Sequence, residues 1–182
     1  MKKFSILTRE QVSPANQVLF DKLEKLAGHV PNLYSVFAYS ENALGNYLAL
    51  QSGKSSLRGR EKEVINLVVS EINGCEYCLA AHTGLARMQG FTDDQILEIR
   101  TISISFDSKL DALARLTGSI VENKGHADEK LIEAFYAAGY DQASLVDVVI
   151  AIGDKIITNY LFALTGVPID YPQAAALKKV SA

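Results

Sequence analysis

Both cysteines of this 182-residue chain lie in one short segment, together with one of its three histidines. Cys75 and Cys78 are three residues apart, and His82 follows Cys78 by four residues. On a helix these offsets place the three side chains on one face. Two thiols one turn apart beside an imidazole can perform redox chemistry, because a thiolate is a nucleophile and the second thiol can close a disulfide on it. The functional interpretation therefore starts from residues 74–82.

The order of these residues predicts different roles for the two sulfurs. His82 is one helical turn from Cys78 but two turns from Cys75, and a base serves the thiol that it can reach. Cys78 is therefore the predicted nucleophile and Cys75 the predicted resolving thiol. A free thiol is only about 3% ionised at pH 7, and a position near a helix N-terminus raises that fraction. Asn73 is the predicted N-cap, with both cysteines in the first two turns.

Two further residues are candidates for the site. Glu63 lies on the preceding apolar segment, and its carboxylate is the predicted proton acceptor or orienter for His82. The alternative is that Glu63 belongs to a charged first turn, since it directly follows Glu61 and Lys62. Tyr77, between the cysteines, either lines the site or packs in the core.

Zinc binding is an alternative use of the same thiols and imidazole, which are ligands that zinc prefers. A structural zinc site needs a fourth ligand, which only His29, His126 or a carboxylate could supply. Cysteine pairs that bind zinc also lie on turns more often than inside helices. We therefore predict a site without metal, and we expect His29 and His126 at the surface.

The segments that must position these residues are predicted to be helical. Residues 32–167 contain no proline, and their apolar residues recur at helical rather than strand spacing. Helices are expected over residues 14–26, after Pro31, over 41–51, over 58–72, and from about 74 to 89. The prediction is an all-α, single-domain helical bundle over residues 1–182, with the site region at about 58–90 and a structural second half at about 106–167.

A weak internal similarity appears at an offset of 49 residues. Residues 90–96 resemble residues 139–145, whereas Cys75, Cys78 and His82 correspond to Lys124, Ala127 and Leu131. One interpretation is a duplicated helical unit of which only the first copy holds the site. The other is that amphipathic helices resemble one another in general.

Composition and charge exclude several classes of partner. The formal net charge is −3 and 21% of the residues are charged, so no basic surface for nucleic acid is expected. The N-terminal apolar run, residues 4–7, is too short for a signal peptide. The longest apolar stretch, residues 148–152, falls below the roughly 20 residues that span a bilayer. We therefore predict a cytoplasmic protein without a membrane partner, in which cysteines are more often catalytic or metal-binding than structural.

Glu63, Cys75, Cys78 and His82 together match the pattern Glu-x11-Cys-x2-Cys-x3-His, and through it the chain resembles the AhpD-like alkylhydroperoxidases of the carboxymuconolactone decarboxylase superfamily. The resemblance extends over about residues 30–172, through Pro31-Asn32-Leu33-Tyr34, Asn159-Tyr160 and Asp170. It implies an all-α fold and a homo-oligomer, a trimer or a multiple of it. It also implies reduction of hydrogen peroxide or organic hydroperoxides, by the second cysteine with a Glu–His proton relay.

One position departs from the pattern of this group. The best-studied enzymes of the group carry a histidine directly before the second cysteine, where this chain has Tyr77. A phenol with a pKa of about 10 cannot act as the same base at neutral pH. The alternatives to a peroxidase or disulfide oxidoreductase are a lyase like the decarboxylase that names the superfamily, which needs no dithiol, and a non-enzymatic, metal-stabilised protein. No Gly-x-Gly-x-x-Gly fingerprint follows a strand, so we predict no flavin or nicotinamide cofactor and expect an external dithiol or protein as reductant.

Overall fold

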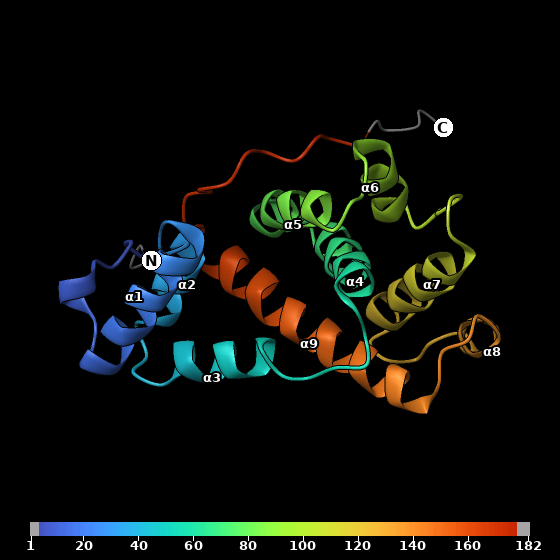
Figure 1. Cartoon of the computed structure of the whole chain (residues 1–182), viewed down its shortest axis with the longest axis horizontal. Helices are drawn as coiled ribbons and strands as arrows, with labels where there is room; N and C mark the ends of the chain where they lie inside the picture. Colours follow the sequence, from blue (N-terminus) through green and yellow to red (C-terminus); the bar gives the residue numbers. More distant parts are fainter. Residues whose placement is uncertain (1–3, 178–182) are drawn as a thin grey trace. The chain divides into compact units, whose positions relative to one another are not determined.

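A computed structural model describes residues 4–177 of the chain. This part folds into helices without a β-strand, so the prediction of an all-α fold is confirmed (Figure 1). The ends of the predicted domain, residues 1–3 and 178–182, lie outside the described residues. The elements, in chain order, are η1 (Arg9–Gln11), α1 (Pro14–Ala27), α2 (Asn32–Phe37), α3 (Ala43–Gln51), α4 (Gly59–Ile72), α5 (Glu76–Met88), α6 (Asp93–Arg100), α7 (Ser108–Glu122), α8 (Glu129–Ala137) and α9 (Gln142–Thr165).

The chain divides into two compact units. Unit 1 contains the residues up to Lys54 together with Tyr160–Asp170, and unit 2 contains Ser55–Asn159 together with the residues from Tyr171 onward. The first part of α9 belongs to unit 2 and its last turns to unit 1. Every residue predicted for the site lies in unit 2. The single domain over residues 1–182 stays a prediction.

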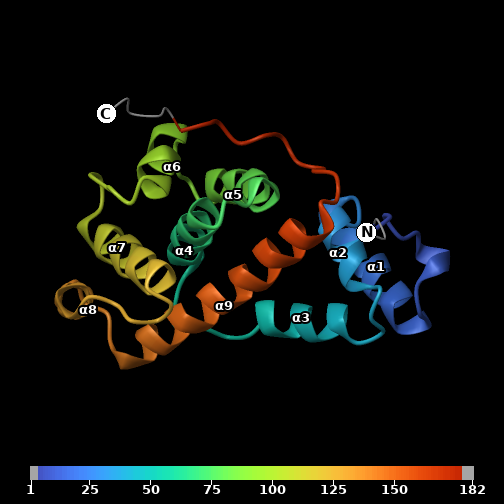
Figure 2. The same ribbon diagram turned by 180° about the vertical axis from the view of Figure 1, so that it is seen from behind.

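Helix α4 is the centre of unit 2. Its residues from Glu63 to Ser70 are all buried, as the apolar pattern on nearly every face predicts. It packs against α5, α6 and α7, and α7 packs in turn against α8 (Figures 1 and 2). The core around α4 also takes in Phe135 of α8 and Val148 and Ile152 of α9. Glu63 therefore lies on a helix that neighbouring helices hold in place on several sides.

Helices of unit 2 repeat along the chain at the offset of 49 residues that the sequence shows. Helices α4 and α7 begin 49 residues apart, as do α6 and α9. Gly90 and Gly139, which precede α6 and α9, have φ angles of 83° and 91°, a conformation that favours glycine. Phe91 and Tyr140 follow them, and both are buried. This correspondence of elements favours the duplicated helical unit over a general similarity of amphipathic helices.

Unit 1 has a separate apolar core formed by α1, α2 and α3. Ser13 caps α1 and Gly28 ends it with φ of 80°, as the sequence predicts. Phe37 of α2 and Tyr47 of α3 are both buried, and their rings stack with centroids 4.5 Å apart. These aromatic residues therefore form the core of unit 1, because α2 and α3 fold back on each other.

Helix α9 extends well beyond the apolar run of residues 148–152, which Gly153, Asp154 and Lys155 follow. As a whole, α9 is long and apolar enough to cross a membrane by length and composition alone. The side of α9 that packs within unit 2 carries polar residues beside the apolar Val148 and Ile152. There Asp147 accepts hydrogen bonds from Ser56, and Lys155 and Asn159 are buried. The opposite face is apolar and exposed, at Val146, Val149, Ile150, Ile157, Tyr160 and Leu164.

Candidate active site

The turn between α4 and α5 places the two cysteines differently from the prediction. Asn73 is the C-cap of α4, and Cys75 is the N-cap of α5. Gly74 has φ of 63°, and this left-handed conformation reverses the chain so that the Cys75 N–H bonds to the Ser70 carbonyl at 2.9 Å. Only Cys78 therefore lies in the first turn of α5, with Cys75 just before it.

The two thiols interact directly in this arrangement. The Cys75 sulfur caps the helix, accepting a hydrogen bond from the Cys78 backbone N–H at 3.4 Å. A hydrogen bond from the Cys75 thiol is the main reason that the pKa of Cys78 falls to about 6, against the opposing effect of burial, and Lys155, His82 and Thr158 lower it further. The same hydrogen bond, together with burial, raises the pKa of Cys75. Cys78 is therefore the thiol that ionises, while Cys75 keeps its proton.

Glu63 and His82 meet although they lie on different helices. The Oε2 atom of Glu63 is 2.8 Å from Nδ1 of His82, and both residues are buried. The other oxygen, Oε1, accepts a hydrogen bond from the Asn66 amide at 3.2 Å. Because an ionised carboxylate only accepts hydrogen bonds, the Nδ1 atom of His82 carries a proton and Nε2 is left as the reactive nitrogen. The structure thus brings all four predicted residues, Glu63, Cys75, Cys78 and His82, into unit 2.

Three residues of α9 complete this environment, and the sequence analysis did not assign them. Lys155 is 2% exposed, and its Nζ atom is 2.7 Å from Nε2 of His82. Thr158 contributes to the lowered pKa of Cys78. Asn159 accepts a hydrogen bond from Asn73 at 2.9 Å and donates one to Ser70 at 3.4 Å, so it holds the turn that presents Cys75. Two sequence signals pointed to α9: a lysine inside a long apolar helix, and Asn159 in the family resemblance.

The remaining candidates lie as follows. Tyr77 is buried, and its ring packs edge-on against Tyr171 at 5.5 Å, so it is a packing neighbour of the thiols. His29 and His126 are exposed, as expected. Within residues 4–177, no three His, Cys, Asp or Glu side chains form a group that could hold a metal ion.

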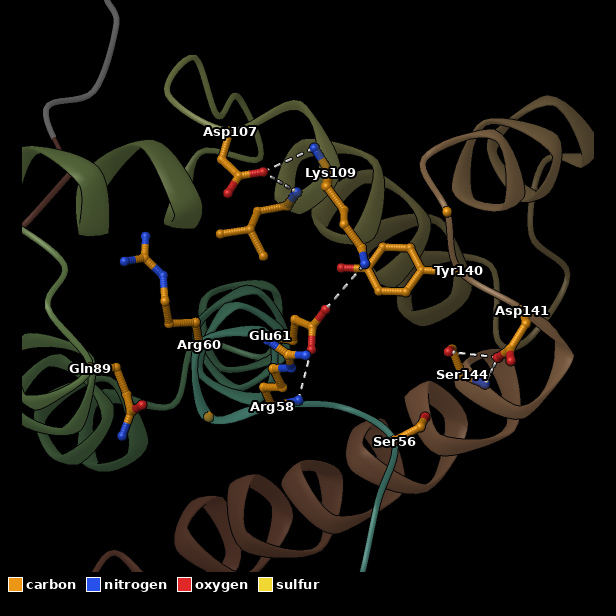
Figure 3. A pocket seen from close by; sticks show the side chains of 13 residues that line it. Ser56, Arg58, Arg60, Glu61, Gln89, Asp107, Lys109, Tyr140, Asp141 and Ser144 are labelled. Carbon is orange, nitrogen blue, oxygen red and sulfur yellow. Dashed lines mark hydrogen bonds and ion pairs between the residues drawn. The ribbon is translucent and has the colours of Figure 1, made fainter.

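A separate polar pocket of about 590 Å³ lies in unit 2, away from these residues (Figure 3). It is lined from the ends of α4, α7 and α9, and neither cysteine borders it. Its carboxylates are already used as caps: Glu61 bonds to the Arg58 N–H, Asp107 to the Lys109 N–H, and Asp141 to Ser144. The polar groups of this pocket thus serve helix ends, and the buried thiols remain the candidate site.

Comparison with known proteins relates part of the chain to a family and nearly all of it to a fold. Residues 42–117 match the model of the carboxymuconolactone decarboxylase family. The chain is 36% identical over 62 residues to the alkyl hydroperoxide reductase AhpD of Mycobacteroides abscessus, a stretch that covers 34% of this chain and 35% of that protein.

Two solved structures share the fold over nearly the whole length. One is an uncharacterized peroxidase-related protein from Silicibacter sp. TM1040, with a TM-score of 0.77, 22% identity, and coverage of 92% of this chain and 94% of that chain. The other is an alkylhydroperoxidase AhpD core protein from Ralstonia eutropha JMP134, with a TM-score of 0.83, 16% identity and 92% coverage of both chains. The stretch that matches the carboxymuconolactone decarboxylase family model contains Glu63, Cys75, Cys78 and His82, and the chain has an AhpD-like fold.

Proposed function

We propose that this protein is a thiol-dependent peroxidase that reduces hydrogen peroxide or organic hydroperoxides. The observation that carries the proposal is the unequal thiol pair. Cys78 has its pKa lowered to about 6, so it is largely a thiolate at neutral pH, whereas the Cys75 that hydrogen-bonds to it stays protonated. A peroxidase of this type needs this difference in protonation, because one sulfur attacks the peroxide as a thiolate while the other stays a thiol until the sulfenic acid has formed.

The reaction follows from these protonation states. The Cys78 thiolate attacks the distal oxygen of the hydroperoxide, the O–O bond breaks, and the alkoxide leaves with a proton from the Glu63–His82 relay. Cys78 is then a sulfenic acid. The Cys75 thiol attacks its sulfur and gives up a proton, so that water leaves and a disulfide joins the two residues. Two thiols and one hydroperoxide become one disulfide, one alcohol and one water.

Restoring the thiols requires two electrons and two protons from outside the chain. An external dithiol, on a protein or of the dihydrolipoyl type, suits this step because its second thiol releases the mixed disulfide intramolecularly. The lyase that gives the family its name needs acid–base groups without a dithiol. The hydrogen bond between Cys75 and Cys78 therefore favours the redox reaction.

Thiol counting tests the proposed function directly. Stoichiometric hydroperoxide is expected to lower the free thiols of the denatured protein from two per chain to zero, with the mass of a single chain on a non-reducing gel. The physical reason is that Cys75 is already in contact with Cys78 and closes the disulfide within one chain. Retention of both thiols after a mild excess of hydroperoxide would falsify the proposal.

We also propose that the protein is a homo-oligomer, a trimer or a multiple of it, joined through the exposed apolar face of α9. Burial of this face between copies would remove side chains such as Val149 and Leu164, which are 54% and 76% exposed, from water. Light scattering is expected to give three times the 19.8 kDa chain mass or a multiple of it. Val149→Glu should lower that mass, and Leu26→Glu, at an exposed site on α1, should not. A mass near 20 kDa for the unmodified protein at micromolar concentration would contradict the assembly.

A further inference from the structure

Lys155 is an ammonium group buried next to the thiols without a carboxylate partner. Its exposed fraction is 2%, and it forms none of the ion pairs found within the described part of the chain, residues 4–177. Asp154, its neighbour on α9, forms no ion pair with it either. A buried charge is costly unless an opposite charge lies nearby. Cys78 is the group that Lys155 acts on, since the positive charge of Lys155 is one cause of its lowered pKa.

The contact between Lys155 and His82 fixes where the protons are. Glu63 accepts from Nδ1 of His82, so Nε2 presents a lone pair to the Nζ atom 2.7 Å away. An ammonium group has three donors and no acceptor, so Lys155 donates to Nε2. One proton therefore lies between the two nitrogens, and it can move from one to the other without movement of the heavy atoms.

We propose that Lys155 is the counter-charge of the Cys78 thiolate and the last member of a proton chain that runs from Glu63 through His82. This inference rests on the proposed function, because it assigns the proton that the leaving oxygen takes up. When the O–O bond breaks, Lys155 gives a proton to the alkoxide. The amine regains it through His82 when the disulfide is reduced and the two protons of the dithiol donor enter the protein.

The test measures the thiolate itself, without peroxide. In a Cys75→Ser background the only thiol is Cys78, and the serine hydroxyl can still donate a hydrogen bond to it. The rate of alkylation by iodoacetamide and the thiolate absorbance at 240 nm are recorded against pH. Methionine has a similar length to lysine and no charge. Lys155→Met is therefore expected to move the midpoint of the Cys78 titration upward by at least about one pH unit. Below the midpoints of the variant and its parent, alkylation should then be about tenfold slower. The rate at alkaline pH should be unchanged, which shows that access to Cys78 is the same.

Two further variants separate charge from other effects. Lys155→Arg should keep the low midpoint but slow peroxide turnover, because a guanidinium stays protonated and cannot pass the proton on. Lys109→Met removes an equal charge from α7 in the same unit and should leave the midpoint unchanged. If the profile of Lys155→Met overlays that of its parent, Lys155 is only a core residue and the proposal fails.

A measurement on the unmodified protein covers the case in which Lys155→Met does not fold. The ¹⁵N chemical shifts of the His82 ring should show a protonated Nδ1 and an unprotonated Nε2 that accepts a hydrogen bond. A neutral ring protonated at Nε2 would overturn the proposal. Neither the alkylation nor the ring shifts depend on peroxide turnover, so an inactive protein with the expected midpoint and tautomer would count against the proposed function and not against the role of Lys155.

Discussion

Replacement of Cys78 by serine is expected to reduce peroxide consumption to background. The serine hydroxyl is close in size to the thiol, so the first turn of α5 should remain intact, but a hydroxyl is not ionised near neutral pH and cannot act as the nucleophile. Stopped-flow measurement of hydroperoxide loss under excess dithiol is the assay, and far-ultraviolet circular dichroism checks the fold.

Cys75→Ser is the matched variant for this experiment, and it should behave differently. Its Cys78 thiolate still attacks the hydroperoxide, so one equivalent per chain is consumed in a single turnover. The reaction then stops at a sulfenic acid, which dimedone labelling and mass spectrometry detect. If Cys75→Ser were inert and Cys78→Ser gave the single turnover, the assignment of the two sulfurs would be reversed.

The attack of Cys78 should also depend on pH. Because its pKa is lowered to about 6, the thiolate is present above that pH and disappears as the pH falls through it. The initial rate of hydroperoxide loss in a single turnover of the unmodified protein, without reductant, is therefore expected to be flat near pH 7–8 and to fall about tenfold for each pH unit below about 5.

Glu63→Gln and His82→Phe are each expected to slow peroxide reduction by about 10²–10⁴-fold, because a positioned proton donor or acceptor contributes that much. The Glu63 carboxylate orients His82 through the 2.8 Å contact, so loss of either group interrupts the same relay. The double variant should be little slower than the slower single variant, since residues that act as a unit are not additive. The measurement is kcat/KM for hydroperoxide in all three variants.

Two control variants match Glu63→Gln and His82→Phe in the residue types exchanged. Glu61→Gln changes a carboxylate on the same helix, two residues away, whose function is to cap α4. His126→Phe changes an exposed histidine. Both should stay within about twofold of the unmodified rate, because neither side chain contacts the thiols or His82. Rates near normal in Glu63→Gln would make Glu63 a structural partner of His82 and remove it from the relay.

The helices of this protein were predictable because their signals are local. Ser13 and Pro14 begin α1, Gly28 ends it, and the apolar pattern of residues 58–72 becomes the buried helix α4. The N-cap of α5 was predicted wrongly. Asn73 is a better capping residue than cysteine by general preference, but Asn73 is held by Asn159 on a helix that comes 86 residues later. Here a long-range hydrogen bond overrides the local preference.

The sequence by itself determined the parts of the candidate site that depend on local spacing, which are the thiol pair and the imidazole one turn beyond it. Such spacings hold wherever the helix lies, because the helical repeat is a property of the backbone. The contact of the Glu63 carboxylate with His82 joins two helices and depends on their packing. Only the tertiary structure decided that Lys155, Thr158 and Asn159 face the thiols. Their position depends on the packing of α9 in unit 2, where the burial of Val148 and Ile152 sets which side of the helix points inward. The hydrogen bond from the neighbouring Cys75 is the main cause of the lowered pKa of Cys78, and the packing of α9 adds Lys155 and Thr158, which lower it further.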